Sequence, residues 1–382
     1  MTKKIDELDM IKGLSIMAVV CIHLLSISGL KQYCGVGIKV EMSLCAPLMI
    51  LFFILSGYLK SNKNEKPCAY LARRLKRIFV PYYAMAAVLL VTYAIIYLAI
   101  ERKSIGWYID GAIGILLQIQ SFHWLDTSST GFHTMYYGAV VGWFLFQMAV
   151  AELIFVPVSY KIREKRSSLK LILAGLFLLL GAIFYILDLQ GLNGKNKPML
   201  LIAFVLPNIP GEAGLMLLGE YLADISFLNF EAYSQPRKII SALISFAVIV
   251  TLMATDNYKY QFPDGNWGPF GAVSFLTETL YGLALIVLLG LICNVIKKFG
   301  PVKSGLSHLG KMSMSILITH YFLAYLTAYI CGFWYKPLAG PVQSPNCITA
   351  IGRFALMFAV IAAFCYLFPR IAKRVFRNVA EK

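Results

Sequence analysis

The sequence predicts an all-α, polytopic membrane protein with about ten transmembrane helices. Three observations support this fold class. Hydrophobic residues make up 59% of the chain and charged residues only 14%, whereas soluble domains contain about a quarter charged residues. Apolar segments of roughly 20 residues, the length that spans a bilayer, recur along the whole chain. Basic residues gather in alternate loops, so the net charge of +16 reflects membrane topology and gives no support for nucleic-acid binding.

Each predicted span is an apolar run bounded by polar residues. In chain order the spans cover approximately residues 10–30, 42–60, 79–100, 136–158, 169–188, 199–222, 238–255, 271–296, 312–333 and 351–371. One set of alternate loops carries about three times as many lysines and arginines as the other, which places that set in the cytoplasm. We therefore expect both termini in the cytoplasm, a single membrane domain over residues 1–382 and a multi-pass location in the cell (plasma) membrane.

Two stretches interrupt this regular pattern. Residues 101–135 contain an apolar piece, 109–119, that is too short to span, so we expect an outer loop with a surface-lying or re-entrant segment. Pro207, Pro210 and Gly211 break the sixth span beside Glu212. Because broken helices in membranes usually line a cavity, Glu212 is a candidate for binding a substrate.

The first span contains two ionisable residues, Lys12 and His23, which are costly inside a bilayer and are therefore candidates for function. Their spacing corresponds to about three helical turns, so both side chains share one face, roughly 16 Å apart along the axis. A deep histidine suits general-base chemistry near neutral pH. The alternatives are a lysine that extends to the membrane surface and a histidine satisfied within the core.

Arginines precede the third span, and two of them, Arg74 and Arg77, are spaced to share one face of a helix. Guanidinium groups bind phosphate bidentately, so this pair, with neighbouring Arg73, predicts a site for a phosphorylated ligand at the membrane edge. Ordinary positive-inside charge is the alternative explanation. Ser56-Gly57 at the inner end of the second span favours close helix packing, although the Ser56 hydroxyl could also bind a ligand.

The remaining candidates are Trp143 and His320 in predicted spans and Trp124 and His133 in the aromatic-rich outer stretch. Aromatic rings there could support the apolar face of a ligand or form an interfacial belt. Histidines with metal-ligand spacing and an HExxH motif are both missing from the sequence, so no metal is expected. Without a P-loop or a GxGxxG motif, ATP-driven and nicotinamide chemistry have no support.

Several of these segments resemble motifs of the acyltransferase-3 family of integral membrane acyltransferases, in the family's order and spacing. Lys12-Gly13 followed by His23 is similar to the opening motif, although many members carry arginine where this chain has Lys12. The other matching segments are residues 52–59 (FFILSGYL), 74–77 (RLKR) leading to Pro81, 142–145 (GWFL) and 309–320, which runs from Leu309-Gly310 through Ser313 to His320. Such proteins move acyl groups, often acetyl, from coenzyme A to sugars and other envelope acceptors.

The resemblance implies an O-acyltransferase that carries an acyl group, acetyl first of all, from cytoplasmic acyl-CoA to a hydroxyl of a cell-envelope or exported carbohydrate. It needs no bound cofactor beyond acetyl-CoA as donor substrate. His23 would act as general base or acyl carrier with Lys12 beside it. Donor-binding candidates are Arg73, Arg74, Arg77 and Ser56, and acceptor-binding candidates are Glu212, Trp124, His133, Trp143 and His320. The alternatives are a transporter or exporter in which His23, Glu212 and His320 relay protons, and a non-catalytic partner in glycan assembly.

Overall fold

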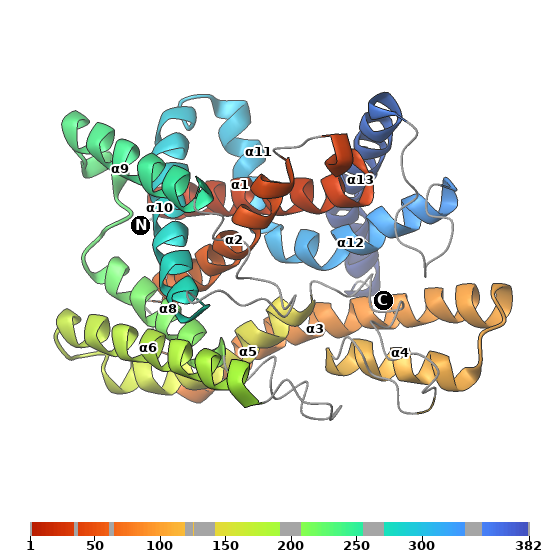
Figure 1. The fold of residues 1–382 in the computed structure, drawn as a ribbon, viewed down its shortest axis with the longest axis horizontal. Coiled ribbons are helices and arrows are strands. Elements are labelled where there is room, and N and C mark those ends of the chain that lie inside the picture. The colour runs from red at the N-terminus through yellow and green to blue at the C-terminus, as the bar shows by residue number, and fades with distance from the viewer. Residues whose placement is uncertain are drawn as a thin grey trace.

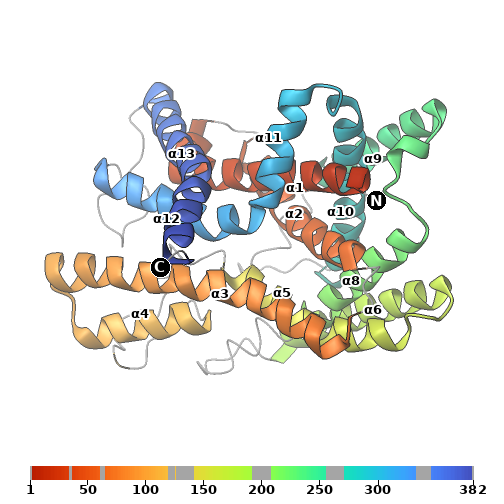
Figure 2. The same cartoon turned by 180° about the vertical axis from the view of Figure 1, so that it is seen from behind.

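The computed structural model of the chain describes residues 2–33, 37–60, 65–118, 125, 142–191, 208–254, 271–332 and 346–380. Within these ranges the chain is built of helices and contains no strand, which confirms the all-α class. Figures 1 and 2 show the helices from two opposite sides. The long helices form a bundle in which α1 and α2 lie centrally and α3 and α4 project to one side.

The described part of the chain contains twelve α-helices. Their bounds are α1 (Thr2–Ile27), α2 (Gly37–Lys60), α3 (Pro67–Tyr93), α4 (Ile105–Leu117), α5 (Gly142–Lys161), α6 (Ser167–Gly191), α8 (Asn208–Asp224), α9 (Gln235–Ala254), α10 (Gly271–Ile296), α11 (Gly300–Lys311), α12 (Ser313–Ile330) and α13 (Cys347–Ala380). A π-helix, Ala94–Ile100, prolongs α3, and two short 3-10 turns cover Leu30–Tyr33 and Phe230–Ala232.

Seven helices in the described ranges are long and apolar enough to cross a membrane. These are Glu7–Ile27, Pro67–Ile100, Phe144–Lys161, Gln235–Ala254, Leu276–Ile296, Ser313–Ile330 and Cys347–Leu367. Every predicted span overlaps a helix, but α8 begins only at Asn208 and the described apolar parts of α2 and α6 are shorter than a full span. The structure therefore supports a multi-pass membrane protein and leaves the count of ten as a prediction, together with the orientation of the termini.

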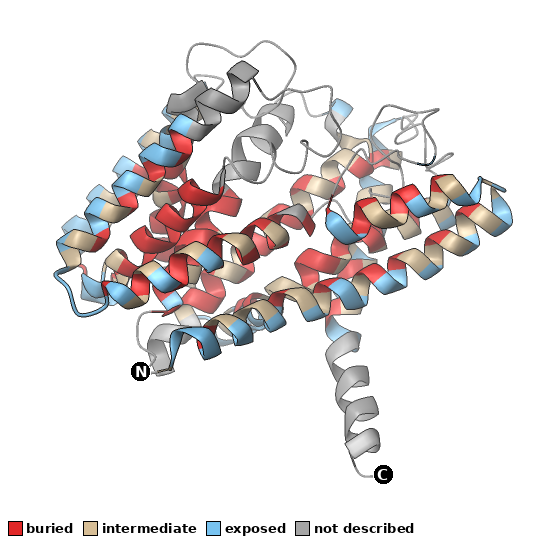
Figure 3. Cartoon of the chain, turned by 90° about the horizontal axis from the view of Figure 1, so that it is seen from below, coloured by how far each residue is buried: buried red, intermediate tan, exposed pale blue. Residues whose placement is uncertain are grey.

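Several outer helices expose apolar side chains along one face, as a lipid-facing surface requires. Figure 3 shows this alternation of exposed and buried positions around the helices at the edge of the bundle. On α9 the exposed residues are Ile239, Ile240, Leu243, Ile244 and Phe246. In water such a stripe would be a large apolar patch, whereas in a bilayer it contacts acyl chains, so its presence agrees with the membrane assignment.

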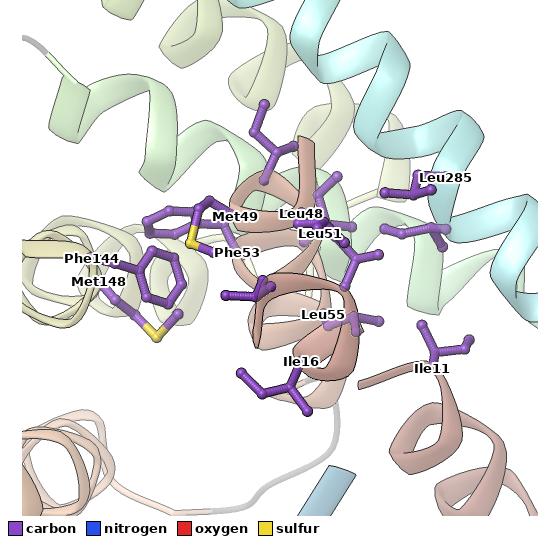
Figure 4. Packing of buried hydrophobic residues seen from close by; sticks show 14 of the residues in the cluster. Ile11, Ile16, Leu48, Met49, Leu51, Phe53, Leu55, Phe144, Met148 and Leu285 are labelled. Carbon is purple, nitrogen blue, oxygen red and sulfur yellow. The ribbon is translucent and has the colours of Figure 1, made fainter. Parts of the chain in front are cut away.

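The core is organised around α2. Figure 4 shows Met49 and Phe53 pointing towards Phe144 and Met148 of α5, and other α2 side chains pointing towards α1 and α10. The rings of Phe53 and Phe144 meet edge to face, with centroids 5.2 Å apart, a favoured aromatic geometry. The remaining labelled residues of this core are Ile11, Ile16, Leu48, Leu51, Leu55 and Leu285.

Glycines let α2 and α8 touch backbone to backbone. A Cβ atom at Gly57 would lie 1.8 Å from the carbonyl oxygen of Met216, and one at Gly219 would lie 2.0 Å from that of Ile54. Gly57 faces Met216 while Ile54 faces Gly219, so the two helices run in opposite directions where they cross. The packing role predicted for the Ser56-Gly57 pair is confirmed for Gly57, since only a residue without a side chain fits there.

A second backbone-to-backbone helix crossing, also at glycine, joins α1 to α11. The sequence pattern had predicted a cytoplasmic loop where α11 lies. Residues 300–311 instead form an amphipathic helix with Leu306, Ser307 and Gly310 buried. A Cβ at Gly310 would lie 1.7 Å from the carbonyl oxygen of Asp9. Figure 2 shows α11 passing across α1. The chain then turns at Met312 into α12, which returns along α1 and carries His320.

Candidate active site

Lys12 and Asp9 form an ion pair on α1, with the Lys12 ammonium nitrogen 2.5 Å from a carboxylate oxygen of Asp9. The two residues are three positions apart, so one turn of helix brings them together. Asp9 is nearly buried, and its backbone carbonyl faces Gly310 of α11. The positive charge of Lys12 therefore has a fixed position at the contact between α1 and α11.

His23 lies against His320, a residue from a distant part of the sequence. Nδ1 of His23 is 2.8 Å from Nε2 of His320, and the two rings are nearly parallel, at 12°. The Tyr321 ring stands against both imidazoles, with centroids 4.5 Å from His23 and 5.4 Å from His320. His320 is 0% exposed, whereas residue His23 is partly exposed. The pair thus has one fully enclosed member and one that is less enclosed.

The backbone of α12 holds His320 from its other side. Its Nδ1 is 2.9 Å from the carbonyl oxygens of both Ile316 and Leu317, one turn earlier in the same helix. Both ring nitrogens of His320 therefore have partners, one in the backbone and one in His23. This arrangement fixes the plane of the His320 ring and, through it, the position of the His23 ring.

A second cluster brings together Ser56 of α2, Arg74 of α3 and Glu152 of α5. Nε of Arg74 is 2.9 Å from Oε1 of Glu152, and Nη2 of the same arginine donates to Glu152 and to the Ser56 hydroxyl. Ser56 in turn donates to the same carboxylate oxygen at 3.2 Å. Glu152 is 0% exposed, and its other oxygen has no hydrogen-bond partner among the described residues. The segments 52–59 and 74–77, which contribute Ser56 and Arg74, thus meet at the buried carboxylate of Glu152.

The arginines of α3 differ in their surroundings. Arg74 is largely buried against Glu152, whereas Arg73 turns outward to Glu65 at 2.5 Å and covers the Tyr70 ring. The Arg77 side chain is exposed. Because the charge of Arg74 is already balanced by Glu152, Arg77 is the better placed of the predicted pair to meet an anionic ligand.

Sequence reasoning did not select a third cluster, which lies between α2, α5, α6 and α8. Lys170 is 3.3 Å from Glu220, which is buried, and 2.7 Å from Asp224, which is exposed at the end of α8. Lys60 contacts Ser159 and lies 4.6 Å above the Phe155 ring. Two lysines and two carboxylates balance in charge, so we interpret this network as structural.

The structure shows few or no contacts for the other predicted substrate-binding residues. Glu212 lies in the first turns of α8, 5% exposed, and one of its carboxylate oxygens has no hydrogen-bond partner among the described residues. Trp143 belongs to α5, but its side chain is outside the described part of the structure. Trp124 and His133 also lie outside the described residues. Their proposed contacts with substrate remain predictions.

Glu152 is the residue that sequence reasoning undervalued. It was visible as an acidic residue within a predicted span, which is a signal for function or for a buried partner. The partner could not be identified, because Arg74 is 78 residues away in the chain. Among the described residues no group of three or more histidine, cysteine, aspartate or glutamate side chains is placed to hold a metal ion.

Comparison with known proteins gives one match. A family model described as an acyltransferase domain matches residues 5–369, nearly the whole chain. No curated protein and no solved structure matches the sequence. The matched region includes both the His23–His320 pair and the cluster of Ser56, Arg74 and Glu152. The chain is an all-helical, multi-pass membrane protein, and it belongs to the acyltransferase-3 family.

Proposed function

We propose that this protein transfers an acyl group, acetyl first of all, from acyl-CoA to a hydroxyl group of a cell-envelope or exported carbohydrate. Membership of the acyltransferase family supports the reaction type. The observation that supports the residue assignment is the contact between His23 and His320, because it fixes the orientation of the His23 imidazole inside the bundle. Acyl transfer to a hydroxyl needs such a group to take up the hydroxyl proton.

In the direct route His23 removes the proton from the acceptor hydroxyl as its oxygen attacks the thioester carbonyl carbon. The new carbon–oxygen bond forms, the carbon–sulfur bond breaks, and the departing thiolate takes the proton from the imidazolium to give free coenzyme A. In the second route the His23 nitrogen attacks the thioester carbon, the carbon–sulfur bond breaks and the thiolate leaves. The acceptor oxygen then attacks the acyl-imidazole, the carbon–nitrogen bond breaks, and the hydroxyl proton is released. Both routes use the same nitrogen, as base in the first and as nucleophile in the second, and need no permanently bound cofactor.

Coenzyme A is highly anionic, and the basic start of α3 offers it a binding surface. We assign the first phosphate contact to Arg77, whose side chain is exposed, with Arg73 beside it. Arg74 and Ser56 are held by Glu152 and would shape the entrance more than supply net charge. Lys12, fixed by Asp9, adds a cation on the helix that carries His23.

For the acceptor we propose binding by Trp124, His133, Trp143 and Glu212. The first two come from the aromatic-rich stretch that follows α4, and such rings commonly support the apolar faces of sugars while hydroxyl groups find polar partners. We place the protein in the plasma membrane with both termini in the cytoplasm, following the bias of basic loops. The transporter alternative has weaker support, because the family match covers residues 5–369 and names a transfer reaction.

The experiment is an assay of purified protein in lipid nanodiscs with acetyl-CoA and a panel of envelope carbohydrates. We expect acceptor-dependent release of free coenzyme A thiol together with an acylated product. Arg77→Ala should raise the KM for the donor about ten- to hundredfold, because a charge-assisted contact contributes about 1.5–3 kcal/mol. Arg237→Ala, which removes an exposed arginine stacked on Tyr233 of another region, is the matched control and should leave that KM unchanged.

Two results would contradict parts of the proposal. Acyl transfer from a different donor, with no thiol release from acyl-CoA under any condition, would show that coenzyme A is not the donor. The acyltransferase reaction itself would still hold. An equal donor KM in wild type and Arg77→Ala would show that Arg77 does not contact the phosphates of the donor.

A further inference from the structure

We propose that His320 is a positioning residue that sets the tautomer of His23, so that Nε2 of His23 is the nitrogen that takes the proton or the acyl group. This inference rests on the proposed function of His23. It replaces substrate binding as the role of His320, because both nitrogens of that ring already have partners within the protein.

The first step concerns Nδ1 of His320. This nitrogen lies 2.9 Å from the carbonyl oxygens of Ile316 and Leu317. A carbonyl oxygen only accepts hydrogen bonds, so Nδ1 must carry a proton. The ring is 0% exposed, and among the described residues no carboxylate forms an ion pair with it. A buried cation without a counter-ion is strongly disfavoured, so the resting ring is neutral and its Nε2 has a lone pair.

The second step passes this assignment to His23. Its Nδ1 is 2.8 Å from Nε2 of His320, which accepts, so Nδ1 of His23 must donate. A neutral imidazole has one N–H, and Nε2 of His23 is consequently left with its lone pair. Residue His23 is partly exposed whereas His320 is enclosed, so the basic nitrogen belongs to the less enclosed member of the pair.

The pair also assists once His23 has accepted a proton. The Nδ1–H of the imidazolium then donates a charge-assisted hydrogen bond to His320, which is stronger than the bond between neutral rings. Tyr321 packs against both rings and restricts their rotation. A base whose remaining nitrogen is oriented by a third group is the general arrangement of activated catalytic histidines. Here His320 supplies that orientation with a lone pair instead of a carboxylate.

Two substitutions of His320 separate positioning from mere packing. The side-chain amide of glutamine reaches about as far as Nε2 of histidine, so His320→Gln can still present an oxygen that accepts from His23. The shorter His320→Asn ends near the Nδ1 position, keeps a polar group beside the carbonyl of Ile316 and does not reach His23. We expect kcat to fall about 10²- to 10³-fold in His320→Asn and less than about tenfold in His320→Gln. The donor KM should be unchanged in both.

Three outcomes decide between the accounts. A wild-type kcat in folded His320→Asn, with His23→Gln inactive, would overturn the positioning role and leave the proposed function intact. Equal losses in the Asn and Gln variants, accompanied by equal losses of thermal stability, would show a structural role only and overturn the inference. Full activity in His23→Gln would overturn the proposed function and this inference with it.

A measurement on the wild-type protein tests the inference even if both variants fail to fold. The chain has five histidines, so nitrogen-15 NMR of histidine-labelled protein can be assigned by comparison with His23→Gln. We expect His23 to show a protonated Nδ1 and an unprotonated Nε2. The opposite tautomer at His23 would overturn the proposal.

Discussion

Glu152 bears its carboxylate at a fully buried position, and Arg74 is the cation that compensates it. Such a pair adds little net stability over a well-packed apolar pair, yet removing only one partner leaves an uncompensated charge in the interior. Ser56 donates to the same carboxylate oxygen, so the serine of the second predicted motif and the arginine of the third act on one group. The Arg74 side chain therefore has a structural role in addition to any role towards the donor.

We predict that Arg74→Met destabilises the protein by about 3–5 kcal/mol, because Glu152 is left buried without a counter-charge. The double variant Arg74→Met/Glu152→Gln should recover most of this loss, since both charges are then absent. Thermal unfolding in detergent measures the difference. A double variant as unstable as the single one would contradict the ion-pair account. Arg77→Ala is the control, because that exposed side chain should affect the donor KM and not the Tm.

At this scale the sequence selects candidate residues but does not identify their partners. Lys12, His23 and Arg74 stand out because charges in or beside membrane spans are costly. The Lys12–Asp9 pair is local and follows from helical spacing. The contact of His23 with His320 joins residues 297 positions apart, and no spacing rule applies over that distance. The partners therefore required the folded arrangement of α1, α3, α5 and α12.

The helix crossings at glycine decide how the elements of the site meet. Gly13 and Gly310 bring α1 and α11 into direct backbone contact, with Leu306 and Asp9 supplying the facing carbonyls. Without this contact α12 would not return along α1 at the depth of His23. Close approach of small residues is the usual means by which membrane helices associate, because burying apolar side chains gains little in lipid.

We predict that Gly310→Ala destabilises the protein by about 1–3 kcal/mol or more, because the new methyl group would lie 1.7 Å from a backbone oxygen that cannot move aside. Gly305→Ala is the matched control on the same helix, where no atom lies within 4 Å of the added group. That control should be neutral or more stable by up to about 1 kcal/mol, since alanine favours helices over glycine.

Thermal unfolding and acyl transfer of the two variants provide the measurement. Loss of both properties in Gly310→Ala alone supports the crossing as the element that positions α12. Equal melting temperatures for the two variants would show that α11 does not pack on α1 in this way.

Long apolar runs in the sequence correctly predicted helices, whereas the amphipathic helix α11 was missed. The helix α11 has only 12 residues and carries Lys303, His308 and Lys311, so hydropathy and charge both resemble a cytoplasmic loop. Its burial depends on glycine contacts with α1 that no local pattern reveals. The short α4 was foreseen as an apolar piece too short to span, because length alone excluded a crossing.

For the whole molecule, alternate ends of the helices carry the basic residues. They occur at the start of α1, α3, α6 and α9 and at the end of α2, α5 and α10. Successive crossings of one membrane, with these ends on the same side, would give this distribution. The class of the protein was therefore predictable from composition and charge. The number of full spans was not, because α8 is described only from Asn208 and is enclosed by the bundle at Gly211 and beyond.

We predict that the donor binds on the cytoplasmic side and the acceptor on the opposite side. Arg73, Arg74 and Arg77 lie in the basic first turns of α3, whereas the loop charge pattern of the sequence puts Trp124 and His133 in an outer stretch. The test presents acyl-CoA and acceptor on opposite faces of sealed vesicles with known protein orientation. Changes at Trp124 or His133 should impair acceptor use and leave donor binding intact. Transfer only when both substrates share the cytoplasmic face would contradict the transmembrane route.

The most direct test of the central claim, that His23 is the group through which acyl transfer proceeds, is the kcat of His23→Gln beside that of His308→Gln. Both variants lose an imidazole, but His308 is an exposed residue of α11. We predict a loss of about 10²- to 10⁴-fold in kcat for a folded His23→Gln protein, as expected for removal of a general base. The His308→Gln protein should retain its rate. A correctly folded His23→Gln protein that transfers acyl groups at the wild-type rate would contradict the account.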